Sequence, residues 1–364
     1  MYENMRAPWI KDINDLPFPN YDLWEELDTY FYFLGQLWLI GSRGCPYTCT
    51  NCEETYIVDS APGRRYRVRE PKNYVDEINY HYEKYKDRGF RMAHPFDPVF
   101  PINRKWTLAF CEEYIASGLS EKLPFSIFAR GDTFYIRAEG EKARNTFDEE
   151  RIMMLAKAGC KEIRMGVESG TERMRNEVHQ KNVTNQQLSE TFEMCHKHGV
   201  MTIAYNMLGG PTETKQEMIE TLKFNMKLKP TKPIFFIYQS LAHDVEMSMI
   251  GEFTPETASN NIKHAVIADI PVETISKRSE KDGATIQFGD PIESKTFSKN
   301  WVIRFQLFCY AYFVGKRVLK LFAHQPLTFI PNFVSYMYKG YKTGANMKIV
   351  FAYFLGSNKK NLFL

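Results

Sequence analysis

The sequence has no run of about 18 uncharged apolar residues, which is the length that a membrane-spanning helix requires. The opening residues, Met1 to Ile10, carry charges and contain no apolar stretch of signal-peptide length. Internal repeats and low-complexity tracts are also missing, which excludes solenoid and collagen-like folds. Of the 364 residues, 44% are apolar and 25% charged, as in ordinary globular proteins. We therefore expect a globular protein of the reducing cytoplasm.

Cysteine is scarce and unevenly placed. Three of the seven cysteines fall in one short loop, Arg43 to Cys52 (RGCPYTCTNC). In a reducing compartment an odd count with three clustered thiols indicates metal or redox chemistry rather than a disulfide framework. The other four, in apolar or helical stretches, are predicted to be small core residues: Cys111, Cys160, Cys195 and Cys309.

The loop has no fourth cysteine. A structural zinc site uses four protein ligands, whereas three cysteines around a cubane iron–sulfur cluster leave one iron open to another molecule. The alternatives are a zinc site completed by His81 or His94, or three unrelated buried thiols.

Acidic residues are missing from the C-terminal region. Residues Trp301 to Leu364 contain nine Lys or Arg and no Asp or Glu. Within this region, Asn300 to Phe322 is predicted to be a helix with an aromatic face and basic residues. Such a helix either covers a core or lies at a membrane interface. The compact Lys/Arg clusters that track a phosphate backbone are lacking, so no nucleic acid is expected.

Apolar runs of strand length alternate with amphipathic stretches of helix length. The predicted strands are Leu37–Gly41, Phe90–Ala93, Phe125–Ala129, Glu162–Val167, Met201–Leu208 and Pro233–Gln239. The predicted helices are Asn73–Arg88, Arg104–Ser117, Asp148–Ala158, Thr184–His198 and Thr214–Leu228. Strict alternation predicts a parallel sheet with helices outside it, in an open doubly wound sheet or a barrel. In both folds ligands bind at the carboxyl ends of the strands.

The cysteine loop follows the first predicted strand and resembles the signature of the radical S-adenosylmethionine superfamily. The stretches Asp12 to Trp24, Arg65 to Pro71 and Phe96 to Phe100 resemble the branch of that superfamily often fused to a cobalamin-binding domain. One departure is Asn51, where members usually have an aromatic residue. The resemblance covers residues 12 to about 240 and implies a partial parallel (β/α)6 barrel with a mainly helical C-terminal extension.

The resemblance also implies the ligands of the cofactors. Cys45, Cys49 and Cys52 would hold a 4Fe–4S cluster whose open iron binds the amino and carboxylate groups of S-adenosylmethionine. Residues 165–171 are similar to the segment that contacts the ribose, and residues 208–213 to the glycine-proline turn after the fifth strand. The cofactor-binding residues implied in this way are Tyr47, Asp97, Arg130, Glu168, Ser169, Gly209, Gly210 and Pro211.

Five of these residues also have a structural interpretation. Glu168 can accept hydrogen bonds from two ribose hydroxyls or stabilise the start of a following helix. Asp97 stands near the expected position of the methionine amino group, or begins a turn with Pro98. Arg130 either pairs with the methionine carboxylate or is solvated. The two glycines before Pro211 either let the backbone approach a ligand or form a plain tight turn.

The implied reaction is reductive cleavage of S-adenosylmethionine to methionine and a 5'-deoxyadenosyl radical, which abstracts hydrogen from an unactivated carbon. An electron donor such as flavodoxin or ferredoxin would be a partner, and the sequence assigns no catalytic residue. The aromatic, basic tail favours a large apolar substrate such as a lipid, an isoprenoid or a tetrapyrrole. We expect a cytoplasmic enzyme, free or peripheral at the inner membrane surface.

Cobalamin stays an open question. None of the eight histidines stands in the D-x-H-x-x-G context of a cobalamin domain. Such a domain would therefore be a separate chain, or the protein works without it, or the sequence is truncated. Two alternatives follow: a cobalamin-dependent radical methyltransferase using a partner or lost domain, and a non-catalytic metal-binding scaffold. The predicted division is a lead-in (1–36), a radical S-adenosylmethionine core (37–240), and a connector with the helical region (241–364).

Overall fold

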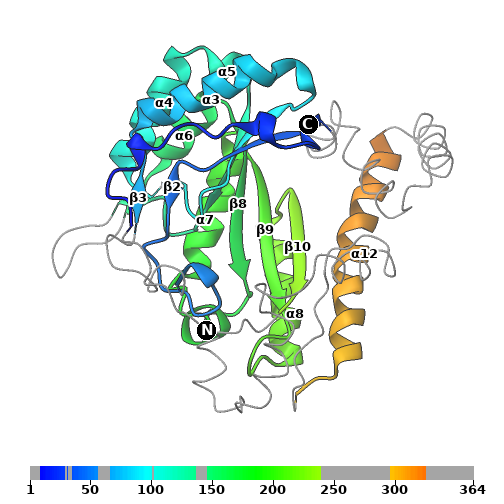
Figure 1. The fold of residues 1–364 in the computed structure, drawn as a ribbon. Coiled ribbons are helices and arrows are strands. Elements are labelled where there is room, and N and C mark those ends of the chain that lie inside the picture. Colours follow the sequence, from blue (N-terminus) through cyan, green and yellow to red (C-terminus); the bar gives the residue numbers. More distant parts are fainter. Residues whose placement is uncertain are drawn as a thin grey trace. The chain divides into compact units, whose positions relative to one another are not determined.

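The computed structural model describes residues 9–28, 31, 35–55, 66–100, 102–136, 146–238 and 296–324 (Figure 1). The chain divides into two units. The first comprises Met1–Ile234 and His243–Phe253, and the second comprises Phe235–Ala242 and Thr254–Leu364. Each unit is described by itself.

The first unit is built on a six-stranded sheet with the strand order β1-β4-β5-β8-β9-β10. Its strands are β1 (Gln36–Leu39), β4 (Met92–Pro95), β5 (Phe125–Ala129), β8 (Cys160–Glu168), β9 (Met201–Leu208) and β10 (Lys232–Ile237), the last of which continues into the second unit. Every neighbouring pair from β1 to β9 is parallel. The strand order follows the chain without reversal, which is the winding of a (β/α) barrel rather than of a doubly wound sheet. The predicted α/β fold with a six-stranded, partial-barrel arrangement is confirmed.

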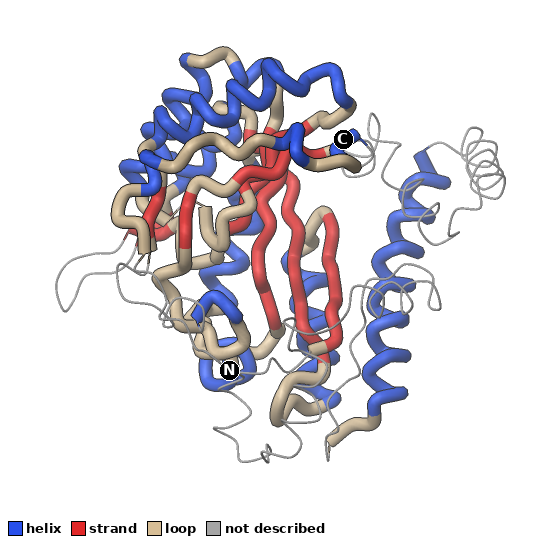
Figure 2. The backbone as a smooth tube through the Cα atoms, viewed as in Figure 1, coloured by secondary structure: helices blue, strands red, loops and turns tan. Residues whose placement is uncertain are grey.

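Helices cover the sheet in the same sequence. They are α3 (Pro71–Tyr85), α4 (Arg104–Ala116), α5 (Leu119–Lys122), α6 (Glu149–Lys157), α7 (Asn185–Lys197) and α8 (Lys215–Leu228). Along the chain α3 packs beside α4, α4 beside α6, α6 beside α7 and α7 beside α8, so the helices form one outer layer (Figure 2).

The helix ends follow from local chemistry. Asp148 caps α6 by accepting a hydrogen bond from the Arg151 N–H. Thr184 and Thr214 begin α7 and α8 with reciprocal capping boxes. After α6 and α7 the chain turns at Gly159 (φ 101°) and Gly199 (φ 69°), where a side chain would be strained.

The core lies between the sheet and the helices. Ile127 and Ile163 on the central strands are fully buried and pack with aromatic rings of α4, among them Phe110. The four cysteines outside the loop are buried, in agreement with their predicted role as core residues.

The small elements that were not predicted include two ribbons and a π-helix. Two antiparallel ribbons pair β2 (Ser42–Arg43) with β3 (Arg67–Val68), and β6 (Tyr135–Ile136) with β7 (Thr146–Phe147). A π-helix, η4 (Arg173–Val178), follows β8. Strands of two residues are too short to show an alternating pattern, and a single π-turn has no distinctive spacing.

In the second unit, the predicted C-terminal helix is present as α12 (Lys299–His324). It packs on the end of β10, where Gln306 Nε2 and Tyr310 Oη donate to the Phe235 carbonyl at 2.7 and 3.0 Å. None of the described helices combines the length and the apolar character that crossing a membrane requires. Most of the predicted connector, residues 239–295, lies outside the described residues.

Candidate functional site

The cysteine loop directly follows β2 at the carboxyl end of β1. Cys45 is buried, Cys49 is half-buried, and Cys52 reaches the surface. Thr50 fixes the loop to a segment far along the chain, because its N–H donates to the His179 carbonyl at 3.1 Å and its hydroxyl to the Val178 carbonyl at 2.8 Å. The loop is therefore held against the end of η4, which follows β8.

The three thiols share one environment. Burial, together with the nearby Cys52 and Cys49 thiols, raises the pKa of Cys45 to about 11. Within the described part of the chain, no three His, Cys, Asp or Glu side chains are close enough to hold a single metal ion. A cubane cluster makes a different demand, since each cysteine binds a separate iron. Three soft thiolate donors in one loop therefore fit a cubane cluster.

The two histidines that could complete a zinc site lie elsewhere. The buried His94 contacts the Ser126 hydroxyl through Nδ1 at 2.7 Å and Arg164 Nη1 through Nε2 at 3.0 Å. The His81 ring, which belongs to α3, is stacked 4.5 Å from the Tyr21 ring. Both imidazoles are occupied by packing or hydrogen bonds away from the cysteine loop.

Arg130, at the end of β5, faces the cysteine loop. Its guanidinium carbon lies 3.6 Å from the centre of the Tyr47 ring, and Nη1 donates to Cys49 Sγ at 3.3 Å. Asp132 accepts from Nε at 2.9 Å and from Nη2 at 3.2 Å. Arg130 is buried rather than solvated, and its charge is directed at Cys49 in the cysteine loop.

Glu168 ends β8 in the left-handed conformation, with φ 59°. Its Oε1 lies 2.5 Å from Lys181 Nζ, and both side chains are largely buried. In the following turn it is the Ser169 hydroxyl that accepts from the Thr171 N–H, at 3.2 Å. The Glu168 carboxylate is thus turned toward Lys181 rather than engaged in capping this turn.

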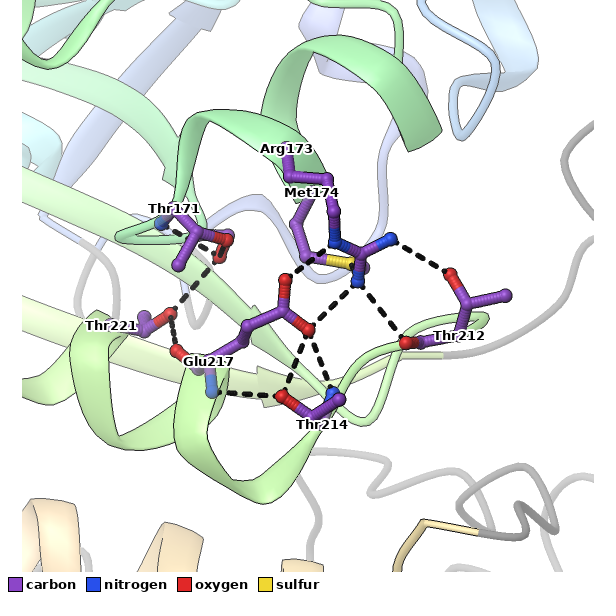
Figure 3. Close-up of polar contacts among 8 residues, drawn as sticks. Thr171, Arg173, Met174, Thr212, Thr214, Glu217 and Thr221 are labelled. Atoms are coloured by element: carbon purple, nitrogen blue, oxygen red, sulfur yellow. Dashed lines mark hydrogen bonds and ion pairs between the residues drawn. The ribbon is translucent and has the colours of Figure 1, made fainter.

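Ser169 belongs to a hydroxyl network with α8. Its Oγ lies 3.2 Å from Thr221 Oγ1, which also accepts from the Gly170 N–H at 2.9 Å. In Figure 3, Thr171 and Thr221 lie to the left of Glu217. Ser169 is buried and ties the end of β8 to a helix.

The glycine-proline turn after β9 is organised by Glu213. Its Oε2 accepts the N–H groups of Gly209 and Gly210 at 2.6 and 3.0 Å. Burial raises the pKa of Glu213 to about 7. Gly209 has φ 82°, which favours glycine, and a side chain on Gly210 would lie 3.1 Å from the Met174 methyl, which would have to shift to admit it.

The same turn is tied to η4 by Arg173. Nη2 donates to the Thr212 carbonyl at 3.1 Å, while Nε and Nη2 contact the two carboxylate oxygens of Glu217 at 2.7 and 2.8 Å (Figure 3). The ends of β8 and β9 are therefore cross-linked beside the cysteine loop.

Asp97, just after β4, is fully engaged. Its Oδ1 accepts from the Ser42 hydroxyl at 2.5 Å, and its Oδ2 accepts from the Tyr74 hydroxyl at 3.0 Å. Burial raises the pKa of Asp97. The residue joins β2, which leads into the cysteine loop, to α3.

Aromatic rings gather on the sheet face that carries Glu168. Along β8, side chains at alternate positions point to one face, so Arg164 and Gly166 share it. A bulge follows Gly166, and the Glu168 carboxylate lies over Gly166 on that same face. Phe128 is in register with Arg164, and Tyr205 with Gly166. Although β8 lies between their strands, the centroids of the Phe128 and Tyr205 rings are only 6.0 Å apart. The two rings therefore meet over β8.

Further rings extend this aromatic face toward β1. The Phe96 ring lies 5.3 Å from that of Phe128 and stacks 4.7 Å from that of Trp38. Phe96 is 39% exposed. Along β8, Tyr205 is level with Gly166, whereas Phe128 is level with Arg164, two residues or about 7 Å nearer the start of the strand.

Comparison with known proteins identifies the family. The sequence profile of the Radical SAM superfamily matches residues 39–224, just over half of the chain. The chain belongs to the Radical SAM superfamily. Members are enzymes that use a 4Fe–4S cluster and S-adenosylmethionine, so the superfamily, enzyme and cofactor predictions are confirmed.

Curated relatives of this radical SAM chain are longer proteins. An anaerobic magnesium-protoporphyrin IX monomethyl ester cyclase of Cereibacter sphaeroides is 28% identical over 66% of this chain and 38% of its own length. An uncharacterized methyltransferase of Pyrococcus horikoshii is 25% identical over 61% of this chain and 43% of its own length. The chain thus spans less than half of either relative.

A solved structure supports the fold. The cobalamin-dependent S-adenosylmethionine radical enzyme OxsB has a TM-score of 0.54 and 17% identity, over 96% of this chain and 50% of its own. At this identity the similarity concerns the fold alone.

Most of the predicted site residues fall into three groups. Tyr47, Arg130 and the cysteines lie together. Glu168 and Ser169 lie at the end of β8, before the segment that holds Thr50. Gly209, Gly210 and Pro211 form the turn after β9. Asp97 accepts hydrogen bonds from the Ser42 and Tyr74 hydroxyls.

Sequence reasoning missed Lys181, Glu213 and Thr50. Glu213 stands two residues after Pro211 and could have been noticed as a carboxylate near two glycine N–H groups. Lys181 and Thr50 carry no pattern, because their partners come from other segments of the chain.

Proposed function

We propose that this chain uses a 4Fe–4S cluster held by Cys45, Cys49 and Cys52 to cleave S-adenosylmethionine reductively and to start radical chemistry on an unactivated carbon. The observation that carries the proposal is the docking of Thr50 on Val178 and His179. This docking holds the cysteine loop against the segment between Glu168 and Lys181, so that donors for iron and an acceptor for ribose occupy one edge of the sheet.

The chain's own residues would bind and orient S-adenosylmethionine. When bound, the cluster supplies the electron that splits S-adenosylmethionine into methionine and a 5'-deoxyadenosyl radical, which takes a hydrogen atom from the substrate. Glu168 would accept the ribose hydroxyls, and Gly209 to Pro211 would let the backbone approach the nucleoside. Arg130 would donate to the Cys49 sulfur, and hydrogen bonds to sulfur tune the potential of such clusters.

The substrate proposed is large and apolar. The aromatic face with Trp38, Phe96, Phe128 and Tyr205 supports this, because aromatic rings beside the proposed site favour an apolar molecule over a polar one. A lipid, an isoprenoid or a tetrapyrrole would fit this description, and the cyclase relative acts on a tetrapyrrole by its name.

A second candidate is methyl transfer with cobalamin from a partner chain or another domain. The methyltransferase name of the Pyrococcus relative favours it. For either reaction we propose a low-potential electron donor such as flavodoxin or ferredoxin. The seven free cysteines support a reducing, cytoplasmic setting.

The test is anaerobic iron–sulfur reconstitution followed by addition of dithionite and S-adenosylmethionine, with and without cobalamin. Wild type should hold about four iron atoms per chain at the cluster and release 5'-deoxyadenosine. Cys49→Ala should lose both properties, while Cys111→Ala, which removes a buried core thiol, should keep the cluster. Cobalamin-dependent S-adenosylhomocysteine would favour methyl transfer. Zinc without iron would overturn the proposal in favour of a metal-binding scaffold.

A further inference from the structure

Lys181 contacts both Glu168 and Arg130, through different atoms. Its ammonium lies 2.5 Å from Glu168 Oε1, in a pair whose side chains are 10% and 15% exposed. Its carbonyl accepts a hydrogen bond from Arg130 Nη2, the guanidinium that also contacts Cys49. One residue therefore links the carboxylate at the end of β8 to the arginine beside the cysteine loop.

The backbone of Lys181 is fixed as well. Its N–H donates to the Arg175 carbonyl at 2.9 Å, and Lys181 follows directly on the segment that holds Thr50. A lysine on a free loop loses side-chain entropy when it pairs, which makes exposed pairs weak. Here the main chain is ordered by other bonds, so the Lys181 ammonium is already aimed at Glu168.

Gly166 provides the room for this pair. A side chain built at Gly166 would begin 2.0 Å from Glu168 Oε1 and 2.4 Å from Lys181 Nζ. Gly166 has no left-handed φ that would require glycine, so the need for a small residue comes from the two charged groups above it. The pair thus lies over the sheet face, between the aromatic rings and the edge of the sheet.

Lys181 also lies within electrostatic reach of the cysteines. Desolvation raises the pKa of the Cys52 thiol, and the Lys181 ammonium acts in the opposite direction. The same cation therefore faces both the proposed nucleoside ligand and the proposed cluster loop.

We propose that Lys181 is a positioning residue that holds Oε1 of Glu168 so that the other carboxylate oxygen is presented to the ribose hydroxyls of S-adenosylmethionine. The inference rests on the proposed function, in which Glu168 binds the ribose. It assigns Lys181 a role in affinity for the nucleoside, because an oriented acceptor loses less freedom on binding than a mobile one. Lys181 itself is not placed on the substrate.

The test compares Lys181→Met, which keeps most of the stem without the charge, with Lys181→Arg, which keeps a cation. Lys197→Met is the matched control, because Lys197 forms an ion pair with Glu149 on the exposed surface of α7. Iron content is measured first, and equilibrium dialysis of the reconstituted proteins then gives the Kd for S-adenosylmethionine, adenosine and 2',3'-dideoxyadenosine.

Lys181→Met should raise the Kd for S-adenosylmethionine and adenosine about tenfold, with iron content unchanged. Wild type and Lys181→Met should bind 2',3'-dideoxyadenosine equally, since this analogue has no ribose hydroxyls for Glu168 to accept. Lys181→Arg should recover most of the affinity, and Lys197→Met should match wild type. Gly166→Ala should act in the same direction as Lys181→Met, because its methyl displaces the pair.

Equal loss of affinity for adenosine and its dideoxy analogue would overturn the inference and give Lys181 a purely structural role. An unchanged Kd in Lys181→Met would overturn it too. Failure of the proposed function is distinguishable, because wild type itself would then lack the cluster or would not bind S-adenosylmethionine.

Discussion

The guanidinium of Arg130 lies over the Tyr47 ring, with its central carbon 3.6 Å from the ring centre and the whole residue 5% exposed. Tyr47 stands between Cys45 and Cys49, so the ring that supports Arg130 belongs to the cysteine loop itself. Loop and arginine therefore stabilise each other before any cofactor binds.

Replacing the Tyr47 ring should show how much its contact with Arg130 contributes to stability. A desolvated cation–π interaction contributes about 1–2 kcal/mol, so Tyr47→Leu should lower the free energy of unfolding of the cluster-free protein by about that amount. Tyr47→Phe keeps the ring under Arg130 and should lose less. Urea unfolding followed by circular dichroism provides both values. Equal losses in the two variants would assign the effect to the Tyr47 hydroxyl instead.

His81 should make stability depend on pH. Both ring nitrogens are buried without a hydrogen-bond partner in the described structure, and burial lowers the pKa of His81 to about 4 from 6.5. The unfolded chain then takes up a proton at a higher pH than the folded one, so stability is full above pH 6.5 and is lost as the pH falls toward 4. Between pH 7.5 and 5 the loss should be about 2 kcal/mol.

The measurement is urea unfolding at several pH values for wild type and His81→Phe. Phenylalanine can keep the stacking on Tyr21 but does not titrate. The difference between the two proteins should therefore shrink or reverse in favour of His81→Phe as the pH falls. Parallel pH profiles for the two proteins would contradict this prediction.

Arg175 should contribute more to the stability of the fold than Arg173, the other arginine of η4. It is fully buried and donates to the carbonyls of Val167 at 3.0 Å and of Ser169, on either side of Glu168. Arg175→Lys cannot keep this planar set of bonds and should destabilise the fold by about 3 kcal/mol. Arg173→Lys, at a side chain 39% exposed, should cost less than about 1 kcal/mol. Similar losses in both variants would mean that burial does not decide the cost.

The fold should tolerate loss of the negative charge of Glu213 but not loss of the oxygen that accepts the backbone N–H groups. Its Oε2 accepts two buried N–H groups, from Gly209 and Gly210. Glu213→Ala leaves both N–H groups without this acceptor, which should lower the free energy of unfolding by about 2–4 kcal/mol. Glu213→Gln retains a carbonyl oxygen at this position and should lose less than half as much. If the Gln variant were as unstable as the Ala variant, the negative charge would be the essential feature.

Much of the fold could be predicted because each long element has a strong local pattern. The predicted strands Phe125–Ala129 and Met201–Leu208 have the same bounds in the structure, and the capped helix ends agree within a few residues. Apolar periodicity, Thr and Asp caps, and glycine stops all act over a few neighbouring residues. The ribbons β2–β3 and β6–β7 depend on pairing between distant residues and left no such signal.

The candidate site was predictable only where its chemistry is compact in the chain. The spacing of three cysteines in one loop is enough to predict a common centre. By contrast, the partners of Asp97 are Ser42 and Tyr74, which are 55 and 23 residues away, and the partner of Glu168 is a lysine across a π-helix. Such pairs form only when the strand ends assemble, so the sequence could name Glu168 but not what orients it.

The bond between the Thr50 hydroxyl and the Val178 carbonyl joins residues 128 positions apart, and this distance matters while the protein is being made. At roughly 5–20 residues per second, the ribosome needs roughly 6–26 seconds to synthesise the stretch that separates them. During that interval the nascent cysteine loop has no docking partner. Iron delivered after η4 has been synthesised would reach a docked cysteine loop. Iron delivered earlier would reach three thiols on a loop that is not yet docked.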